Sequence, residues 1–169
     1  GSAIMASTDE FTITVRGRGG HASMPHQAGD PIPIACEVVT ALQSMVTRRI
    51  DAFDPAVVTV AKIRAGTTTN VIPETATLWG TIRTVSARTR ETALAEVERT
   101  ARGIAEAHGA SAEIELVRGY PVTINDDDAA RFALATAGRL LGSANAVELP
   151  NPVMGGEDWS YVLEQVPGC

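Results

Sequence analysis

Hydrophobic and polar residues alternate in four stretches of this chain, which is the pattern expected of half-buried β-strands. In the first stretch, Phe11, Ile13 and Val15 alternate with polar residues. In the longest, small and aliphatic residues occupy one side, whereas Trp79 and Arg83 fall on the other. The alternation predicts strands over residues 11–15, 57–64, 75–85 and 112–117.

Two longer stretches repeat their apolar residues at helical spacing. One begins at Asp30 and Pro31, which suit the N-cap and first turn of a helix, and continues to about residue 49. The other begins at Ser86 and ends at Gly109. The predicted order is β-α-β-β-α-β, which makes the fold class α+β. We expect a ferredoxin-like, four-stranded antiparallel sheet with both helices on one face.

The two helices can cover only one face of such a sheet. The other face carries Trp79 and a row of threonines, and the edge strands remain available for pairing. Because β-branched edge strands are usually blunted or used for association, we expect this surface to form a homodimer.

The last third of the chain has a different character. Residues 126–141 form an Ala- and Leu-rich helical stretch, and Pro150 and Pro152 frame a turn before a further short helix. Helices with apolar faces but no sheet of their own cannot build a core, so they are expected to belong to a larger domain. The sequence thus predicts a first domain over residues 9–118, an incomplete part over residues 119–169, and a chain that is a fragment of a longer protein.

Composition narrows the possible partners. A net charge of −6 with only 4% aromatic residues argues against a nucleic-acid partner, which would require a basic face and stacking rings. No apolar run approaches the roughly 18 residues of a membrane helix, and the first residues do not resemble a signal peptide. Cys36 lies in a helical stretch and Cys169 is the last residue, which favours reduced thiols in a cytoplasmic protein.

The best candidate for chemistry is the Gly-rich segment VRGRGGHASMPH, in which His21 follows Gly17, Gly19 and Gly20. Glycines let the backbone bend tightly and approach a ligand closely. A polar turn with solvated histidines is the simpler alternative. The segment formally satisfies a dinucleotide fingerprint, but Pro25 and several loop residues separate it from the next helix. His21 and His26 are poorly spaced to bind one metal ion together.

The combination of three segments is more informative than any one of them. These segments are VRGRGGHASMPH, TTTNVIPETATLWGTIRT and MGGEDWSYVLEQVPG, in that order. Together they resemble the M20 family of dinuclear-metal peptidases and amidohydrolases, and most of all its N-acyl-amino-acid and hippurate hydrolase branch. In that family a ferredoxin-like domain is inserted into the metal-binding catalytic domain, where it serves as lid and dimerisation module. The resemblance implies that residues 9–118 are this lid and residues 119–169 the return into the catalytic domain.

The resemblance also implies roles for individual residues. His21 matches a lid histidine that reaches into the partner subunit's active site and stabilises the oxyanion formed when water adds to the amide. Asn70 and Arg83 match positions that bind the carboxylate end of the substrate. Asp158 matches an acid near the rim of the active site, without a defined role. For Glu157 and Asp158 an equally good explanation is that helix N-termini favour acids, and His26 is explained as well by a hydrogen bond that fixes the turn.

The implied parent enzyme uses two divalent metal ions, zinc or manganese, to hydrolyse N-acyl amino acids or small peptides. The family's metal ligands lie in segments that are absent from this sequence, so we expect no metal in this chain and no activity from it alone. The alternative is a stand-alone, ferredoxin-like dimeric module that binds amino acids or small anions.

Overall fold

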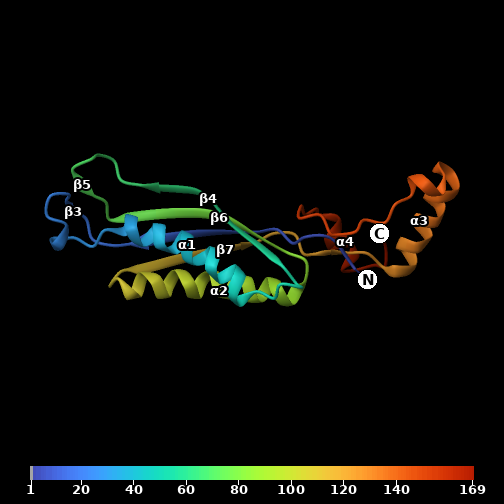
Figure 1. Ribbon diagram of the computed structural model, residues 1–169, viewed down its shortest axis with the longest axis horizontal. Coiled ribbons are helices and arrows are strands. Elements are labelled where there is room, and N and C mark those ends of the chain that lie inside the picture. Colours follow the sequence, from blue (N-terminus) through green and yellow to red (C-terminus); the bar gives the residue numbers. More distant parts are fainter. Residues whose placement is uncertain (1) are drawn as a thin grey trace.

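The computed structural model describes residues 2–169 and is elongated, with a four-stranded sheet at one end and a smaller helical part at the other (Figure 1). The sheet is antiparallel in the order β4-β6-β2-β7. Its strands are β2 (Asp9–Arg16), β4 (Ala56–Ala65), β6 (Thr75–Thr84) and β7 (Ser111–Arg118). Helices α1 (Pro31–Arg49) and α2 (Ala87–Ala107) lie on one face of it. The predicted ferredoxin-like α+β fold is confirmed, with strand ends displaced by one or two residues.

One continuous core lies between the two helices and the sheet. The inward side chains of β2, Phe11, Ile13 and Val15, are at most 1% exposed. They pack against the apolar faces of both helices. Every second residue of the strands and the residues at helical spacing on α1 and α2 therefore form one apolar layer. Further members of this core on the helices and on β6 include Ile34, Val38, Leu42, Met45, Leu78, Ile82, Leu94 and Val97.

Side chains cap both helices at the predicted positions. Asp30 accepts a hydrogen bond from the backbone N–H of Ile32, and Ser86 accepts one from that of Thr89. Asp54 reinforces the second cap, because the hydroxyls of Ser86 and Thr89 both donate to its carboxylate at 2.6 Å. Burial alone would raise the pKa of Asp54, but these hydrogen bonds, together with the nearby Arg88 guanidinium, hold it below its ordinary value.

The structure contains short strands that the sequence pattern did not indicate. Strand β3 (Gly20–His21) pairs with β5 (Val71–Ile72), and β1 (Ala3–Met5) pairs with β8 (Thr123–Ile124). The second pair therefore gives the last third of the chain a small sheet. Both pairs join segments that are far apart in the sequence, and each is too short to show a period.

The C-terminal part carries helices α3 (Asp127–Leu141) and α4 (Trp159–Leu163), and 3-10 turns occupy Pro25–Gln27 and Ser143–Asn145. Phe132 and Leu140 on α3 are 71% and 78% exposed, so its apolar side chains have little cover. Across residues 2–169, no helix has both the length and the apolar character that a membrane crossing requires.

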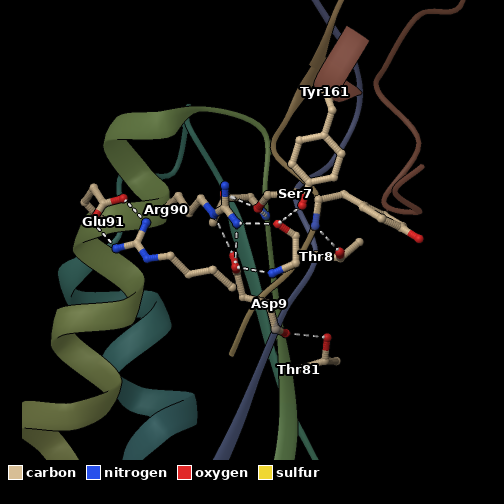
Figure 2. Close-up of polar contacts among 11 residues, drawn as sticks. Ser7, Thr8, Asp9, Thr81, Arg90, Glu91 and Tyr161 are labelled. Carbon is tan, nitrogen blue, oxygen red and sulfur yellow. Dashed lines mark hydrogen bonds and ion pairs between the residues drawn. The ribbon is translucent and has the colours of Figure 1, made fainter. Parts of the chain in front are cut away.

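A buried ion pair closes the junction between the sheet and the C-terminal part (Figure 2). The guanidinium of Arg90, in the first turn of α2, donates to both carboxylate oxygens of Asp9 at 2.7 and 2.9 Å. Arg90 also donates to the carbonyl of Gly119, which accepts a further hydrogen bond from the hydroxyl of Tyr161 on α4. The start of β2, the start of α2 and the C-terminal part are thus connected at one point.

Candidate functional site

His21 lies at the tip of the sheet that is farthest from the C-terminal part, where β3 and β5 are labelled in Figure 1. It pairs with Val71 across this short two-stranded sheet. The chain then turns, because the backbone N–H of Met24 donates to the His21 carbonyl. His21 is exposed, so it contributes a chemically accessible imidazole and little packing.

The glycines before His21 are required by a close backbone approach. A Cβ atom at Gly17 would lie 2.0 Å from the carbonyl oxygen of Gly29, and one at Gly20 would lie 2.9 Å from the Cβ of Ala28. Positive φ angles occur elsewhere among the described residues, at Gly66, Gly109 and Gly142. The segment before His21 therefore packs against the chain that follows it, and this packing fixes where the histidine lies.

Asn70 lies beside His21. Its carbonyl accepts a hydrogen bond from the backbone N–H of Ala22, the residue after His21, and its side-chain oxygen accepts one from Thr68. The structure thus brings two of the predicted site residues to one tip of the sheet. His26 lies in the adjacent 3-10 turn, is exposed and makes no side-chain hydrogen bond within the described chain.

Arg83 lies on β6, on the sheet face that the helices leave uncovered. Its neighbours on that face include Thr81 and Trp79, and the ammonium of Lys62 lies 4.2 Å from the Trp79 ring centroid. Within residues 2–169 the Arg83 guanidinium forms no ion pair, whereas most other arginines of the chain do. A guanidinium of this kind on a sheet face is suited to a carboxylate from a ligand.

Arg83 and His21 of one chain are too far apart to contact one small substrate. Arg83 lies eight residues after Thr75 along β6, a distance of roughly 26 Å at about 3.3 Å per residue. His21 lies beyond the Thr75 end of this strand, on the β3–β5 pair. The structure therefore separates Arg83 from His21 and from Asn70.

The C-terminal acids lie at the Arg83 end. A Cβ atom at Gly156 would lie 2.2 Å from the Thr8 side chain, so the Gly155–Gly156 segment packs directly against the chain entering β2. Asp158 follows it, exposed, at the N-cap position just before α4, where its side chain makes no capping hydrogen bond. The backbone carbonyl of Glu157 accepts a hydrogen bond from Ser160. Asp158 and Arg83 thus flank the same end of the sheet.

The described residues do not gather a metal-binding cluster. Across residues 2–169, no group of three or more His, Cys, Asp and Glu side chains is arranged to hold a metal ion. His21 ends strand β3 and His26 lies in the 3-10 turn that follows, whereas His108 lies at the end of α2 with its Nε2 atom 2.6 Å from the Glu37 carboxylate. The donor set that is present does not fit a dinuclear metal centre.

The structure shows specific contacts for two residues that are not among the predicted site residues, Ser23 and Asp9. Ser23 contacts the His21 ring, a contact that the two-residue spacing alone does not predict. Asp9 is fully buried. The sequence pattern could have indicated the burial of Asp9, because Asp9 lies at the same alternate positions of the strand as the buried residues Phe11, Ile13 and Val15. A carboxylate that points into the core requires a cationic partner.

Comparison with known proteins supports one family. The family profile described as peptidase dimerisation domain matches residues 8–109. The chain is 38% identical over 166 residues to N-acetylcysteine deacetylase of Bacillus subtilis, which covers 98% of this chain and 43% of that protein. It is 38% identical over 162 residues to hippurate hydrolase of Campylobacter jejuni, covering 96% of this chain and 42% of that protein.

A solved structure agrees with these relatives. A dinuclear metal binding M20 peptidase from Bacillus subtilis superposes with a TM-score of 0.76 at 31% identity, covering 99% of this chain and 40% of that one. The chain thus spans less than half the length of the relatives it matches. The sheet order, the two-helix layer and the sequence similarity agree, and the chain belongs to the M20 family of peptidases and amidohydrolases, whose dimerisation domain it contains.

Proposed function

We propose that this chain is part of a metal-dependent amidohydrolase that cleaves the amide bond of N-acyl amino acids or small peptides. Residues 9–118 would form its lid and dimerisation domain, and residues 119–169 would return into the catalytic domain. Support comes from the similarity to deacetylases and a hippurate hydrolase. The exposed apolar side chains of α3, which need cover from other parts of a larger domain, agree with it.

The separation of His21 from Arg83 is the observation that carries the proposal. A homodimer can bring the two residues into one site, because a two-fold axis can place the His21 tip of one subunit beside the Arg83 end of the other. The uncovered sheet face and the edge strands β4 and β7 are available for such an interface. Each active site would then be composite, with Arg83 from one chain and His21 of the partner subunit.

The proposed roles follow from the donors that each side chain carries. His21 would donate a hydrogen bond to the oxyanion that develops on the amide carbonyl. Arg83 would bind the substrate carboxylate through its planar fork of N–H donors. Asn70, held beside His21, would add amide donors from the same tip, and Asp158 would lie near the rim on the Arg83 side.

The parent enzyme would use two divalent metal ions, zinc or manganese, to supply the attacking water. Because the described residues do not form a fitting ligand set, those ligands would come from the rest of the longer protein. In this proposal the chain contributes oxyanion stabilisation, substrate binding and subunit association, and the protein acts in the cytoplasm.

Complementation between two inactive variants of the longer enzyme tests this proposal. A His21→Ala subunit and an Arg83→Ala subunit each lack one half of every site in their own homodimers. In a mixed dimer one site lacks both residues and the other is intact. Random exchange should therefore restore about one quarter of the wild-type activity.

Subunit exchange must be verified with two differently tagged variants. A mixture that exchanges fully and stays inactive would refute the composite site. Mixing His21→Ala with Asn70→Ala is the matched control, because both residues lie at the same tip. That mixture leaves each site without one of the two donors and should show no recovery.

A further inference from the structure

We propose that Ser23 is a positioning residue that holds His21 as a neutral imidazole with its proton on Nε2. The consequence for catalysis rests on the proposed function, whereas the protonation pattern itself can be tested in this chain. The contacts of the His21 ring carry the inference, since the Nδ1 atom is contacted by two groups of Ser23.

One of those two groups can only donate. The backbone N–H of Ser23 lies 3.1 Å from His21 Nδ1 and points its hydrogen at that atom. A backbone N–H has no lone pair to offer, so Nδ1 must accept and cannot carry a proton in this arrangement. In a neutral imidazole the proton then resides on Nε2.

The Ser23 hydroxyl adds a second contact, at 2.8 Å from Nδ1. A hydroxyl can donate or accept, so by itself it would tolerate either form of the ring. With the backbone N–H already fixing Nδ1 as an acceptor, the hydroxyl donates as well. Two donors on one ring nitrogen restrain the rotation of the imidazole about its bond to Cβ.

The turn itself keeps the Ser23 N–H in place. The N–H of Met24 donates to the His21 carbonyl at 2.9 Å, and that of Ala22 donates to the Asn70 carbonyl at 3.1 Å. The neighbouring amides are thus used in backbone pairing, and the Ser23 amide is left directed at the ring. The peptide geometry after His21 therefore selects the tautomer.

This arrangement defines what His21 can do chemically. With Nδ1 accepting from Ser23, Nε2–H is the donor that remains for a ligand, and the ring offers a neutral N–H rather than two acidic ones. An oxyanion would be stabilised by hydrogen bonding while the proton stays on Nε2. A proton acceptor role for Nε2 is disfavoured, since it would require the proton to move to the nitrogen that Ser23 occupies.

Nitrogen-15 NMR of the imidazole rings of this chain, at about pH 8 where an ordinary histidine is neutral, tests the tautomer directly. We expect the His21 Nδ1 signal at the position of an unprotonated nitrogen and Nε2 at that of a protonated one. His26, whose ring has no such contact, provides an internal reference with averaged signals. A His21 ring protonated on Nδ1, or averaged like His26, would overturn the proposal.

Variants at Ser23 separate its two contacts. Ser23→Ala removes the hydroxyl and keeps the N–H, so the preference for Nε2–H should fall by roughly fivefold, the effect of one neutral hydrogen bond. Ser23→Thr retains a hydroxyl and should restore the wild-type signals. An unchanged tautomer ratio in Ser23→Ala would mean that the hydroxyl does not act on the ring.

The backbone contact has its own readout. Hydrogen exchange of the Ser23 amide should be slower in the wild type than in His21→Phe by roughly fivefold, because phenylalanine keeps a ring but offers no acceptor. Equal exchange in both would refute the N–H contact. In the longer enzyme, Ser23→Ala should lower kcat with little change in KM, since ring orientation affects the transition state. The NMR outcome does not depend on the subunit complementation, so the two proposals can fail separately.

Discussion

Replacing Arg90 with alanine should destabilise this chain more than removing any exposed arginine. The Asp9 side chain is completely buried, and that of Arg90 is 11% exposed. Arg90→Ala leaves the Asp9 carboxylate buried with the backbone N–H of Gly119, at 3.3 Å, as its remaining donor at that end (Figure 2). Breaking a buried pair in this way costs about 3–5 kcal/mol, because the carboxylate stays buried without the cation that was hydrogen-bonded to it.

Arg118→Ala is the matched control for this experiment. Arg118 pairs with Glu91, which lies next to Arg90 on α2, but both side chains of that pair are more than half exposed. Exposed pairs contribute little because water screens them. Urea unfolding followed by circular dichroism should therefore shift strongly in Arg90→Ala and little in Arg118→Ala.

A double variant shows whether charge burial is the cause. Combining Arg90→Ala with Asp9→Asn removes the orphaned carboxylate, so the double variant should be more stable than Arg90→Ala alone. The reasoning fails if Arg90→Ala and Arg118→Ala unfold at the same urea concentration. It fails equally if removing the Asp9 charge gives no recovery in the Arg90→Ala background.

Four further outcomes are expected. His21→Ala should leave the melting temperature of this chain nearly unchanged, because the side chain is exposed; a large decrease in calorimetry would contradict a purely chemical role. Gly17→Ala should destabilise the chain, because the added Cβ would lie 2.0 Å from the Gly29 carbonyl oxygen. Gly103→Ala, where the added Cβ meets no atom within 4 Å, should stabilise helix α2 by about 0.5–1 kcal/mol. Equal effects of the two variants in thermal unfolding would refute this comparison. The pKa of Asp54 is lowered in the folded state, so the stabilising contribution of its carboxylate is complete above about pH 4 and is lost as the pH falls through the pKa of the folded state. The difference in unfolding free energy between wild type and Asp54→Asn should therefore narrow as the pH falls below about 4. A difference that stays constant with pH would contradict this prediction. Light scattering of dilute protein should show a dimer, and a monomer at high concentration would contradict the proposed interface.

Local patterns predicted those parts of the fold that depend on local physics. The alternation along β2 and the helical spacing of α1 and α2 result from burial on one face, which any sequence window of sufficient length reveals. The caps at Asp30 and Ser86 could be predicted because each side chain accepts a hydrogen bond from a backbone N–H only two or three residues later. This bond depends on local sequence and not on what the helix packs against. These elements were placed to within one or two residues.

Long-range pairing could not be predicted in this way. The β3–β5 and β1–β8 pairs bring together two-residue segments that carry no period of their own. Their formation depends on the sheet that positions their ends. The same limit applies to the site, where the motifs identify His21, Asn70 and Arg83 as a set, although only the strand register shows that Arg83 lies at the opposite end from the other two.

In the proposed enzyme, the length of the sheet has a consequence for the active site. Strands β4 and β6 are ten residues long, so each spans about 33 Å, far more than a small substrate. A chain that placed His21 and Arg83 in one monomeric site would need a much shorter sheet or a folded-back tip. The tip is instead held outward by the β3–β5 pairing and by the close packing at Gly17. Donors fixed at opposite ends of a rigid sheet can act on one substrate only when a two-fold axis sets the tip of one copy against the opposite end of the other. In the proposed enzyme, subunit association and catalysis are therefore inseparable.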